Sequence, residues 1–196
     1  MKKWYNLYSP TYFGTTFLGS APCNDPSRMM GRIVETTLYD ITGDFSQQHI
    51  KLYFQVVDLK GNDAYTIFKG HEYSRDYLRS LVRRGSTRVD RILNLATKDG
   101  YRLRVSVTAL SIIRIKTTQV SLIRALIQTI LNEKAMKLEF SQFVQEAVLG
   151  KIASDIYNES KKICPLRHVG LRKSKLLASP PSKPAEDIEV EVTVEA

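Results

Sequence analysis

The sequence lacks the short motifs that most directly identify an enzyme or a metalloprotein. It contains no glycine-rich phosphate loop and no Gly-x-Ser-x-Gly motif, and its three histidines are scattered along the chain. Its two cysteines, Cys23 and Cys164, have no second cysteine or histidine at ligand spacing, which argues against a zinc site and against a disulfide framework. We therefore predict no catalytic residues, no metal, no cofactor and no small-molecule substrate.

Long apolar runs are also missing. No stretch of about 18 uncharged apolar residues occurs, and the N-terminus lacks the apolar region of a signal peptide. These absences favour a cytoplasmic protein that does not insert into a membrane. With 196 residues, 43% of them hydrophobic, the chain is long enough to bury a sizeable core.

Acidic residues are scarce outside one short segment. The whole chain has a formal net charge of +9, but residues 186–196 contain five acidic residues and no basic one. Residues 1–185 therefore carry 29 basic and 15 acidic side chains, a net charge of +14. A body this basic favours an anionic partner, either nucleic acid or an acidic membrane surface.

Apolar and polar residues alternate from about residue 31 to about residue 115, which is typical of strands with one buried face. We predict strands over 50–57, 64–69, 89–97 and 101–109. Turn signals at 60–63 and 98–100 join these strands into hairpins. Several short antiparallel strands of this kind predict a barrel or a strongly curled sheet.

The apolar spacing becomes helical after residue 117. We predict helices over 117–137, from a cap at Ser141 to near Gly150, and over 151–162, followed by an extended segment over 166–177. The predicted fold class is therefore α+β, an antiparallel β-barrel-like sheet with a C-terminal helical α/β part.

Three parts follow from these patterns. Residues 1–116 form a β-rich, barrel-like part with one basic helix, and residues 117–177 form a helical part with a final extended basic segment. Residues 178–196 begin rich in proline and serine and continue acidic. Such a composition cannot bury enough surface to order itself, so we predict a disordered acidic tail.

The segment Gly70–Arg84, GHEYSRDYLRSLVRR, predicts a single amphipathic helix with one basic stripe. Arg75, Arg79 and Arg83 follow one another at helical spacing. Guanidinium groups placed in this way repel one another unless a polyanion lies opposite. The segment therefore indicates an element that faces phosphate.

Two further basic clusters occur, one on the 101–109 strand and one between residues 161 and 177, which contain no acidic residue. Arginine binds phosphate in a fixed, planar geometry, which favours contact with structured RNA over a merely solvated surface. The candidate RNA-binding residues are Arg75, Arg79, Arg83, Arg84, Arg88, Arg91, Arg102, Arg104, Arg167, Arg172, Lys173 and Lys175. Tyr73, Tyr77 and Tyr101 either stack on bases or pack in the core.

The first thirteen residues are rich in aromatic side chains. This segment either contacts a neighbouring protein or packs into the chain's own barrel. The candidate residues for a partner-protein contact are Trp4, Tyr5, Tyr8, Tyr12 and Phe13.

Four segments together resemble a known family. They are GRIVETTLYDITGD at Gly31–Asp44, GHEYSRDYLRSLVRR at Gly70–Arg84, TKDGYRLRV at Thr97–Val105 and PLRHVGLRKSKLL at Pro165–Leu177. In this order they are similar to the eS-one family of small-subunit ribosomal proteins, also called S-three-A-e, of archaea and eukaryotes. The resemblance covers most of residues 3–177, and the short chain is more similar to archaeal members.

The resemblance implies a structural constituent of the small ribosomal subunit with no catalytic activity. It implies a ribosome-associated place on the platform near the mRNA exit, with small-subunit rRNA and neighbouring ribosomal proteins as partners and mRNA as a further candidate partner. The chain departs from the family in two ways. The lysine-rich arm that usually precedes the Lys2–Tyr5 segment is short here, and the acidic tail does not belong to the matching core.

Two other functions stay open from the sequence. One is a dissociable RNA-binding regulator of translation, which would bind single-stranded RNA reversibly. The other is a nuclease, which would need a carboxylate cluster. The aspartates at 40, 44, 58, 63 and 99 lie at predicted turns and strand ends, where aspartate serves local hydrogen bonding instead.

Overall fold

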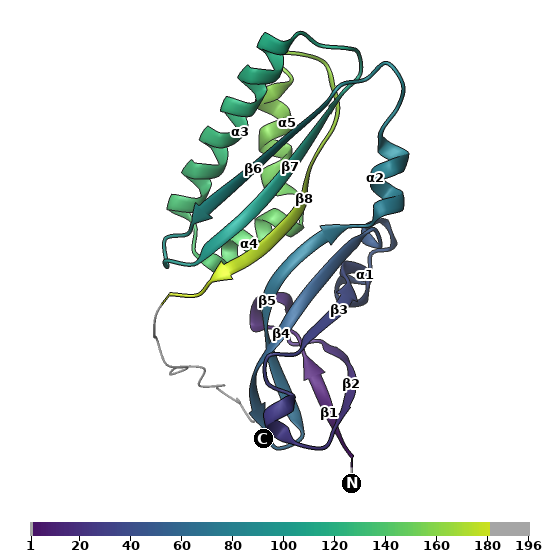
Figure 1. Cartoon of the computed structure of the whole chain (residues 1–196), viewed down its shortest axis with the longest axis vertical. Helices are drawn as coiled ribbons and strands as arrows, with labels where there is room; N and C mark the ends of the chain where they lie inside the picture. The colour runs from purple at the N-terminus through teal and green to yellow at the C-terminus, as the bar shows by residue number, and fades with distance from the viewer. Residues whose placement is uncertain (1, 181–196) are drawn as a thin grey trace, which may run out of the picture.

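A computed structural model describes residues 2–180 of the chain and has a mixed α+β fold, which confirms the predicted fold class (Figure 1). The strands are β1 (Lys3–Tyr8), β2 (Phe17–Cys23), β3 (Ile33–Thr37), β4 (Ile50–Lys60), β5 (Asp63–Tyr73), β6 (Arg88–Ala96), β7 (Arg102–Ser111) and β8 (Leu166–Ala178). The α-helices are α1 (Leu38–Thr42), α2 (Arg75–Leu81), α3 (Thr117–Lys137), α4 (Phe140–Val148) and α5 (Lys151–Ser160). Short 3-10 helices are η1 (Thr11–Phe13), η2 (Pro26–Arg28) and η3 (Phe45–Gln47).

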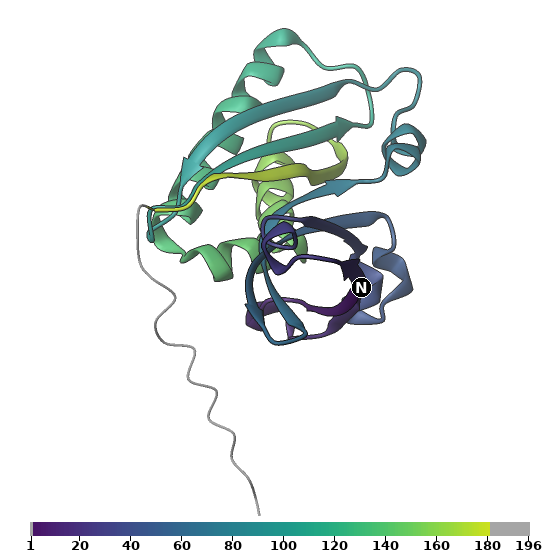
Figure 2. The ribbon, with the colours of Figure 1, turned by 60° about the horizontal axis from the view of Figure 1, so that its bottom comes forward.

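Strands β1 to β5 curl around a shared interior and form the barrel-like part (Figure 2). The long hairpin of β4 and β5 dominates it, and the turn of this hairpin places Gly61 at a φ of +64°. Leu52, Phe54 and Val56 alternate into the interior and are almost fully buried, as their spacing predicted. The pairing of β1 with β5 is parallel, whereas the other strand pairs are antiparallel.

Strands β6, β7 and β8 form the helix-covered part of the fold, with α3 and α5 packed against one side of them (Figure 1). The sequence patterns grouped β6 and β7 with the barrel-like residues 1–116, yet in space these strands lie with the helices. The reason is their pairing, because β7 lies between β6 and β8 and its apolar face supports α3 and α5.

Strand β5 joins the barrel-like and helix-covered parts into one sheet. One edge of β5 pairs with β4, and the other edge pairs first with β1 at residues 63–65 and then with β8 at residues 70–72. At this junction a Cβ atom on Gly70 would lie 2.4 Å from the carbonyl oxygen of Ser174. Only glycine lets the two backbones approach so closely.

The main core extends through both parts. Phe54 and Phe68 from the barrel-like part belong to the same buried cluster as Val105 of β7, Ile127 of α3 and Ile152 of α5. This continuous core fixes how the two parts sit against each other. A smaller cluster around Tyr5, Met29 and Ala64 fills the far end of the barrel.

The predicted helix over Gly70–Arg84 is wrong at both ends. Strand β5 continues to Tyr73, which pairs with Ile50, and α2 contains only residues 75–81. The first residues of this segment form a strand because they pair with β8. His71 is buried there, and its ring nitrogens lie against the Leu171 carbonyl and the Ser174 hydroxyl. Tertiary pairing therefore overrides the helical spacing here.

The start of α4 also differs from the prediction. The helix begins at Phe140, and its first amide donates to Oδ2 of Asp99 over 2.9 Å, so the side chain that satisfies this terminus comes from the β6–β7 turn and not from Ser141. Gly150 separates α4 from α5 with a φ of +83°, as predicted for a helix C-terminus. The predicted disordered tail, 178–196, lies from residue 181 onward outside the described residues.

Candidate nucleic-acid interface

One face of the β6–β7–β8 sheet is covered by helices, and the other carries basic side chains. Along β7 the residues that point toward the helices, Leu103, Val105 and Val107, are buried. Arg102 and Arg104 point to the opposite face and are exposed, and so are Lys173 and Lys175 on β8. We call these four residues the open-face cluster.

The register of the strands places like charges opposite each other in this cluster. Arg104 pairs directly with Lys175 across β7 and β8. Like charges directly opposite in a sheet repel and destabilise it. Such an arrangement favours a polyanion on this face. Alternation along β7 sets the face of Arg104, and the pairing of β7 with β8 brings Lys175 opposite it.

Few internal partners neutralise the open-face cluster. Lys173 forms an ion pair with Glu72 at 2.8 Å, and Nε of Arg104 donates to the Asn94 side chain at 2.9 Å. Within residues 2–180, neither Arg102 nor Lys175 has an ion pair or a side-chain hydrogen bond. Their charges are available to an external anion.

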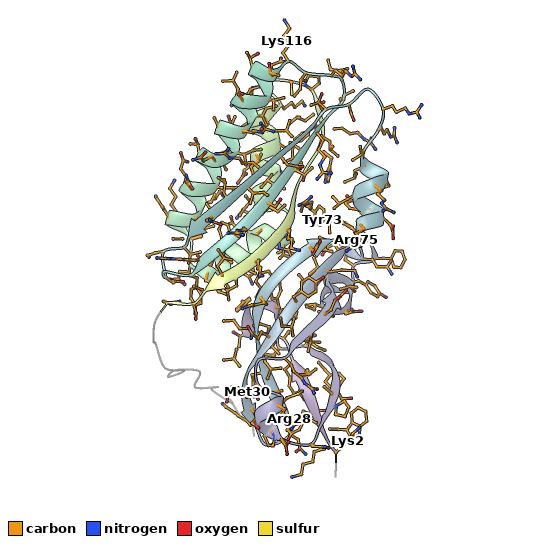
Figure 3. All side chains as sticks on the ribbon, viewed as in Figure 1. Lys2, Arg28, Met30, Tyr73, Arg75 and Lys116 are labelled. Carbon is orange, nitrogen blue, oxygen red and sulfur yellow. The ribbon has the colours of Figure 1, made fainter. Side chains whose placement is uncertain are left out.

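A second basic surface lies on α2 and the loop that follows it. Arg75 is exposed at the start of α2, where the two parts of the fold meet (Figure 3), and Arg79 is exposed one turn later. Arg83 and Arg84 are also exposed but lie in the loop, because the helix ends at Leu81. None of these four forms an ion pair with another described residue.

The remaining candidates lie elsewhere. Arg88 is exposed at the far end of β6 and is paired with Asp90 at 2.9 Å. Arg91 turns toward α3 and donates to Gln128, so the structure does not bring it to the open face. Arg167 donates to the Leu81 carbonyl at 3.2 Å, which ties β8 to the end of α2. Arg172 is half-buried at a bulge in β8.

Most of the predicted aromatic contact residues pack within the protein. Tyr5 is buried in the smaller core, and Tyr101 stacks on Phe140 with ring centroids 4.4 Å apart. The hydroxyl of Tyr12 accepts a hydrogen bond from the Phe68 amide, and burial raises the pKa of this phenol. Phe13 packs edge-on against Phe54.

Two of these aromatic residues, Trp4 and Tyr8, remain at the surface, and Tyr8 lies beside two further exposed aromatic residues. Trp4 is 61% exposed, and Tyr8 lies against Phe17 and Tyr65, whose exposed fractions are 58% and 41%. We call these four residues the aromatic patch. Phe17 and Tyr65 were missed in the sequence because their link to Tyr8 depends on the pairing of three strands.

Neither a metal site nor a membrane-spanning helix occurs in the stretch of chain that the structure describes. Between residues 2 and 180, no three histidine, cysteine, aspartate or glutamate side chains come together as metal ligands. In the same range, no helix is both long and apolar enough to cross a membrane. Cys23 and Cys164 are both buried free thiols.

Comparison with known proteins identifies the family of the chain. The model of the Ribosomal S3Ae family matches residues 1–180. The chain belongs to this family. The resemblance seen in the sequence is thereby confirmed, and the Ribosomal S3Ae family is a family of ribosomal proteins and not of enzymes.

Relatives of this Ribosomal S3Ae protein include archaeal proteins that match it over most of their length. The small ribosomal subunit protein eS1 of Desulfurococcus amylolyticus is 49% identical over 180 residues, which are 92% of this chain and 84% of the relative. The protein of the same name from Staphylothermus marinus is 46% identical, with 92% and 85% covered. That of Aeropyrum pernix is 47% identical over 195 residues, with 97% and 91% covered.

Proposed function

We propose that this chain is a structural constituent of the small ribosomal subunit that binds rRNA phosphates through the open-face cluster and the arginines of α2. The observation that carries this proposal is the direct pairing of Arg104 with Lys175 on an exposed sheet face. The repulsion between these two charges is relieved when a polyanion binds to the face and persists when the face lies in water. The archaeal relatives named small ribosomal subunit protein eS1 support the same role.

The position within the subunit belongs to the proposal. By its family resemblance, the chain lies on the platform near the mRNA exit, in the cytoplasm and bound to ribosomes, with mRNA as a further partner. The aromatic patch is the surface that contacts a neighbouring ribosomal protein, with Trp4 and Tyr8 as the sequence-predicted residues within it. Large exposed aromatic side chains are typical of such contacts.

Sedimentation tests the proposal directly. The protein should co-sediment with small subunits at one copy per subunit and remain there through a moderate-salt wash. Sub-stoichiometric amounts that wash off would instead support the dissociable RNA-binding regulator. Absence from the small-subunit fraction would defeat the proposal.

A paired variant tests the α2 arginines in the same assay. Arg79→Glu combined with Arg83→Glu should reduce incorporation into subunits without unfolding the protein, because both side chains are exposed and form no ion pair with a described residue. Incorporation at the wild-type level would remove these arginines from the interface.

A further inference from the structure

A groove of about 460 Å³ lies where the barrel-like part, α2 and the α4–α5 pair meet. Residues from four separate stretches of the chain form its walls. They are η3 and the start of β4, the end of β5 with α2, the α4–α5 junction, and the start of β8. The groove therefore exists only in the folded molecule, and it does not overlap the open-face cluster.

Five flat rings line the groove, and four of them, His49, Tyr73, Tyr77 and His168, lie against one another. His49 lies against Tyr77 with ring centroids 3.8 Å apart and planes tilted by 30°. Tyr73 approaches Tyr77 edge-on with ring centroids 5.6 Å apart, and His168 approaches Tyr77 edge-on at 6.2 Å. Rings in this arrangement form a surface on which another flat, aromatic group can stack.

The polar groups of the groove suit a ligand with a negative charge and a polar edge. Arg167 lines the groove, and its lining residues include no carboxylate. Nε2 of His168 is buried and has no hydrogen-bond partner among the described residues. Burial lowers the pKa of His49 and of His168, which favours the neutral imidazoles. Nδ1 of His49 donates to the Ser46 carbonyl at 3.0 Å, so its Nε2 is left to accept a hydrogen bond from a ligand.

The wall of the groove is held in place by close packing. A Cβ atom on Gly170 would lie 2.8 Å from the hydroxyl oxygen of Tyr73 and 3.0 Å from Nε2 of His168. Glycine at this position of β8 thus lets both rings lie directly against the sheet. Preformed walls reduce the cost of ordering a ligand.

We infer that this groove holds one unstacked nucleotide of the rRNA, with its base on the ring of Tyr77 or His49 and its phosphate near Arg167. The inference rests on the proposed function and extends it, since it adds recognition of a single base to the phosphate contacts of the basic face. A nucleotide is favoured over a segment of a partner protein because the lining has a cation and no anion, and because the exposed Arg75 and Arg79 lie on the adjoining helix. Unstacked bases in RNA are commonly bound by rings in this way.

Two variants and one matched control test this inference. Tyr77→Leu removes the central ring, and Ser154→Trp fills the groove from an exposed position on α5. Gln142→Trp adds the same side chain at an exposed position of α4 that does not line the groove. The full-length proteins are bound to small-subunit rRNA transcribed in vitro. The affinity and the chemical reactivity of each nucleotide are then measured, and circular dichroism checks folding.

Tyr77→Leu and Ser154→Trp should each lower the affinity about tenfold. They should restore the free-RNA reactivity of the same one or two nucleotides. Tyr77→Leu leaves Arg167 in place and should keep the salt dependence of binding, whereas Ser154→Trp also excludes the phosphate and should lower the salt slope by less than about 1. Gln142→Trp should behave as wild type. Wild-type affinity and reactivity in both groove variants would overturn the inference, and so would a crosslink from the groove to a neighbouring protein in assembled subunits. If the wild-type protein itself does not bind the rRNA, the proposed function fails, and the inference fails with it.

Discussion

Removing two charges from the open-face cluster should weaken RNA binding and leave the fold intact. The double variant Arg102→Gln with Lys175→Gln removes the two side chains of the cluster that have no partner among the described residues. Each lost phosphate contact lowers the slope of log affinity against log salt by about 0.9 on duplex nucleic acid. At about 0.1 M salt this corresponds to about 1.2 kcal/mol, or about eightfold in affinity, per contact.

The double variant should therefore bind small-subunit rRNA about 60-fold more weakly at about 0.1 M salt, with a slope smaller by about 1.8. Its stability should not fall, because Lys175→Gln relieves the repulsion from Arg104 across the strands, an effect of up to about 0.5 kcal/mol. Filter binding over a series of salt concentrations measures the first effect, and urea denaturation measures the second.

The matched control removes two charges on the helical side. Arg124→Gln with Lys116→Gln changes two exposed residues on and beside α3, which packs on the other face of the sheet. This variant should keep the wild-type salt slope. An unchanged slope in the Arg102 and Lys175 variant, or an equal loss in the control, would refute the reasoning that phosphates bind on the open face.

Two predictions concern the junction between the barrel-like and helix-covered parts. Gly70→Ala places a methyl group 2.4 Å from the Ser174 carbonyl oxygen, so the free energy of unfolding in urea should fall by about 3 kcal/mol, whereas a loss below about 1 kcal/mol would show that the strands move apart easily. Burial lowers the pKa of His71 to about 4, below its ordinary unfolded value of about 6.5. The folded state therefore favours the neutral His71 ring. The contribution of this ring to the free energy of unfolding is complete above about pH 6.5 and is lost as the pH falls toward 4. Between about pH 7.5 and 5.5 the wild type should lose about 1.3 kcal/mol more stability than His71→Gln, and equal losses in urea titrations would contradict this.

The elements with strong periodicity could be predicted from the sequence. The buried face of β4, the alternation along β7 and the start of α3 at Thr117 agree with the expected patterns, because each of these elements packs one regular face on a core. The family resemblance also came from the sequence, through four segments in order. Two of these segments contain the four basic residues of the open-face cluster.

Features that depend on pairing between distant segments could not be predicted from local sequence patterns. The Gly70–Arg84 helix was overestimated because the burial of His71 depends on β8, about a hundred residues away. The start of α4 was misplaced for the same reason, since its terminal amide bonds Asp99 of a distant turn. The aromatic patch needed the register of β1 against both β2 and β5.

The candidate RNA-binding residues differ in the same respect. Arg102 and Arg104 could be placed on one face by alternation alone, but their approach to Lys173 and Lys175 needed the pairing of β7 with β8. Arg91 lies on the opposite face of β6 from Arg88 and Ile92 and contacts α3. The alternation along β6 separates Arg91 from the other candidates, although the run of basic residues groups them. The face on which a basic side chain lies thus predicts an RNA contact better than the number of basic residues in its segment.

A density map of the assembled small subunit with this protein in place tests the central claim most directly. The account predicts that rRNA phosphates lie within ion-pair distance of Arg102, Arg104 and Lys175, with the open face of β6–β7–β8 turned to RNA. A map in which this face lies in solvent, or against the acidic side chains of a neighbouring protein, would contradict it.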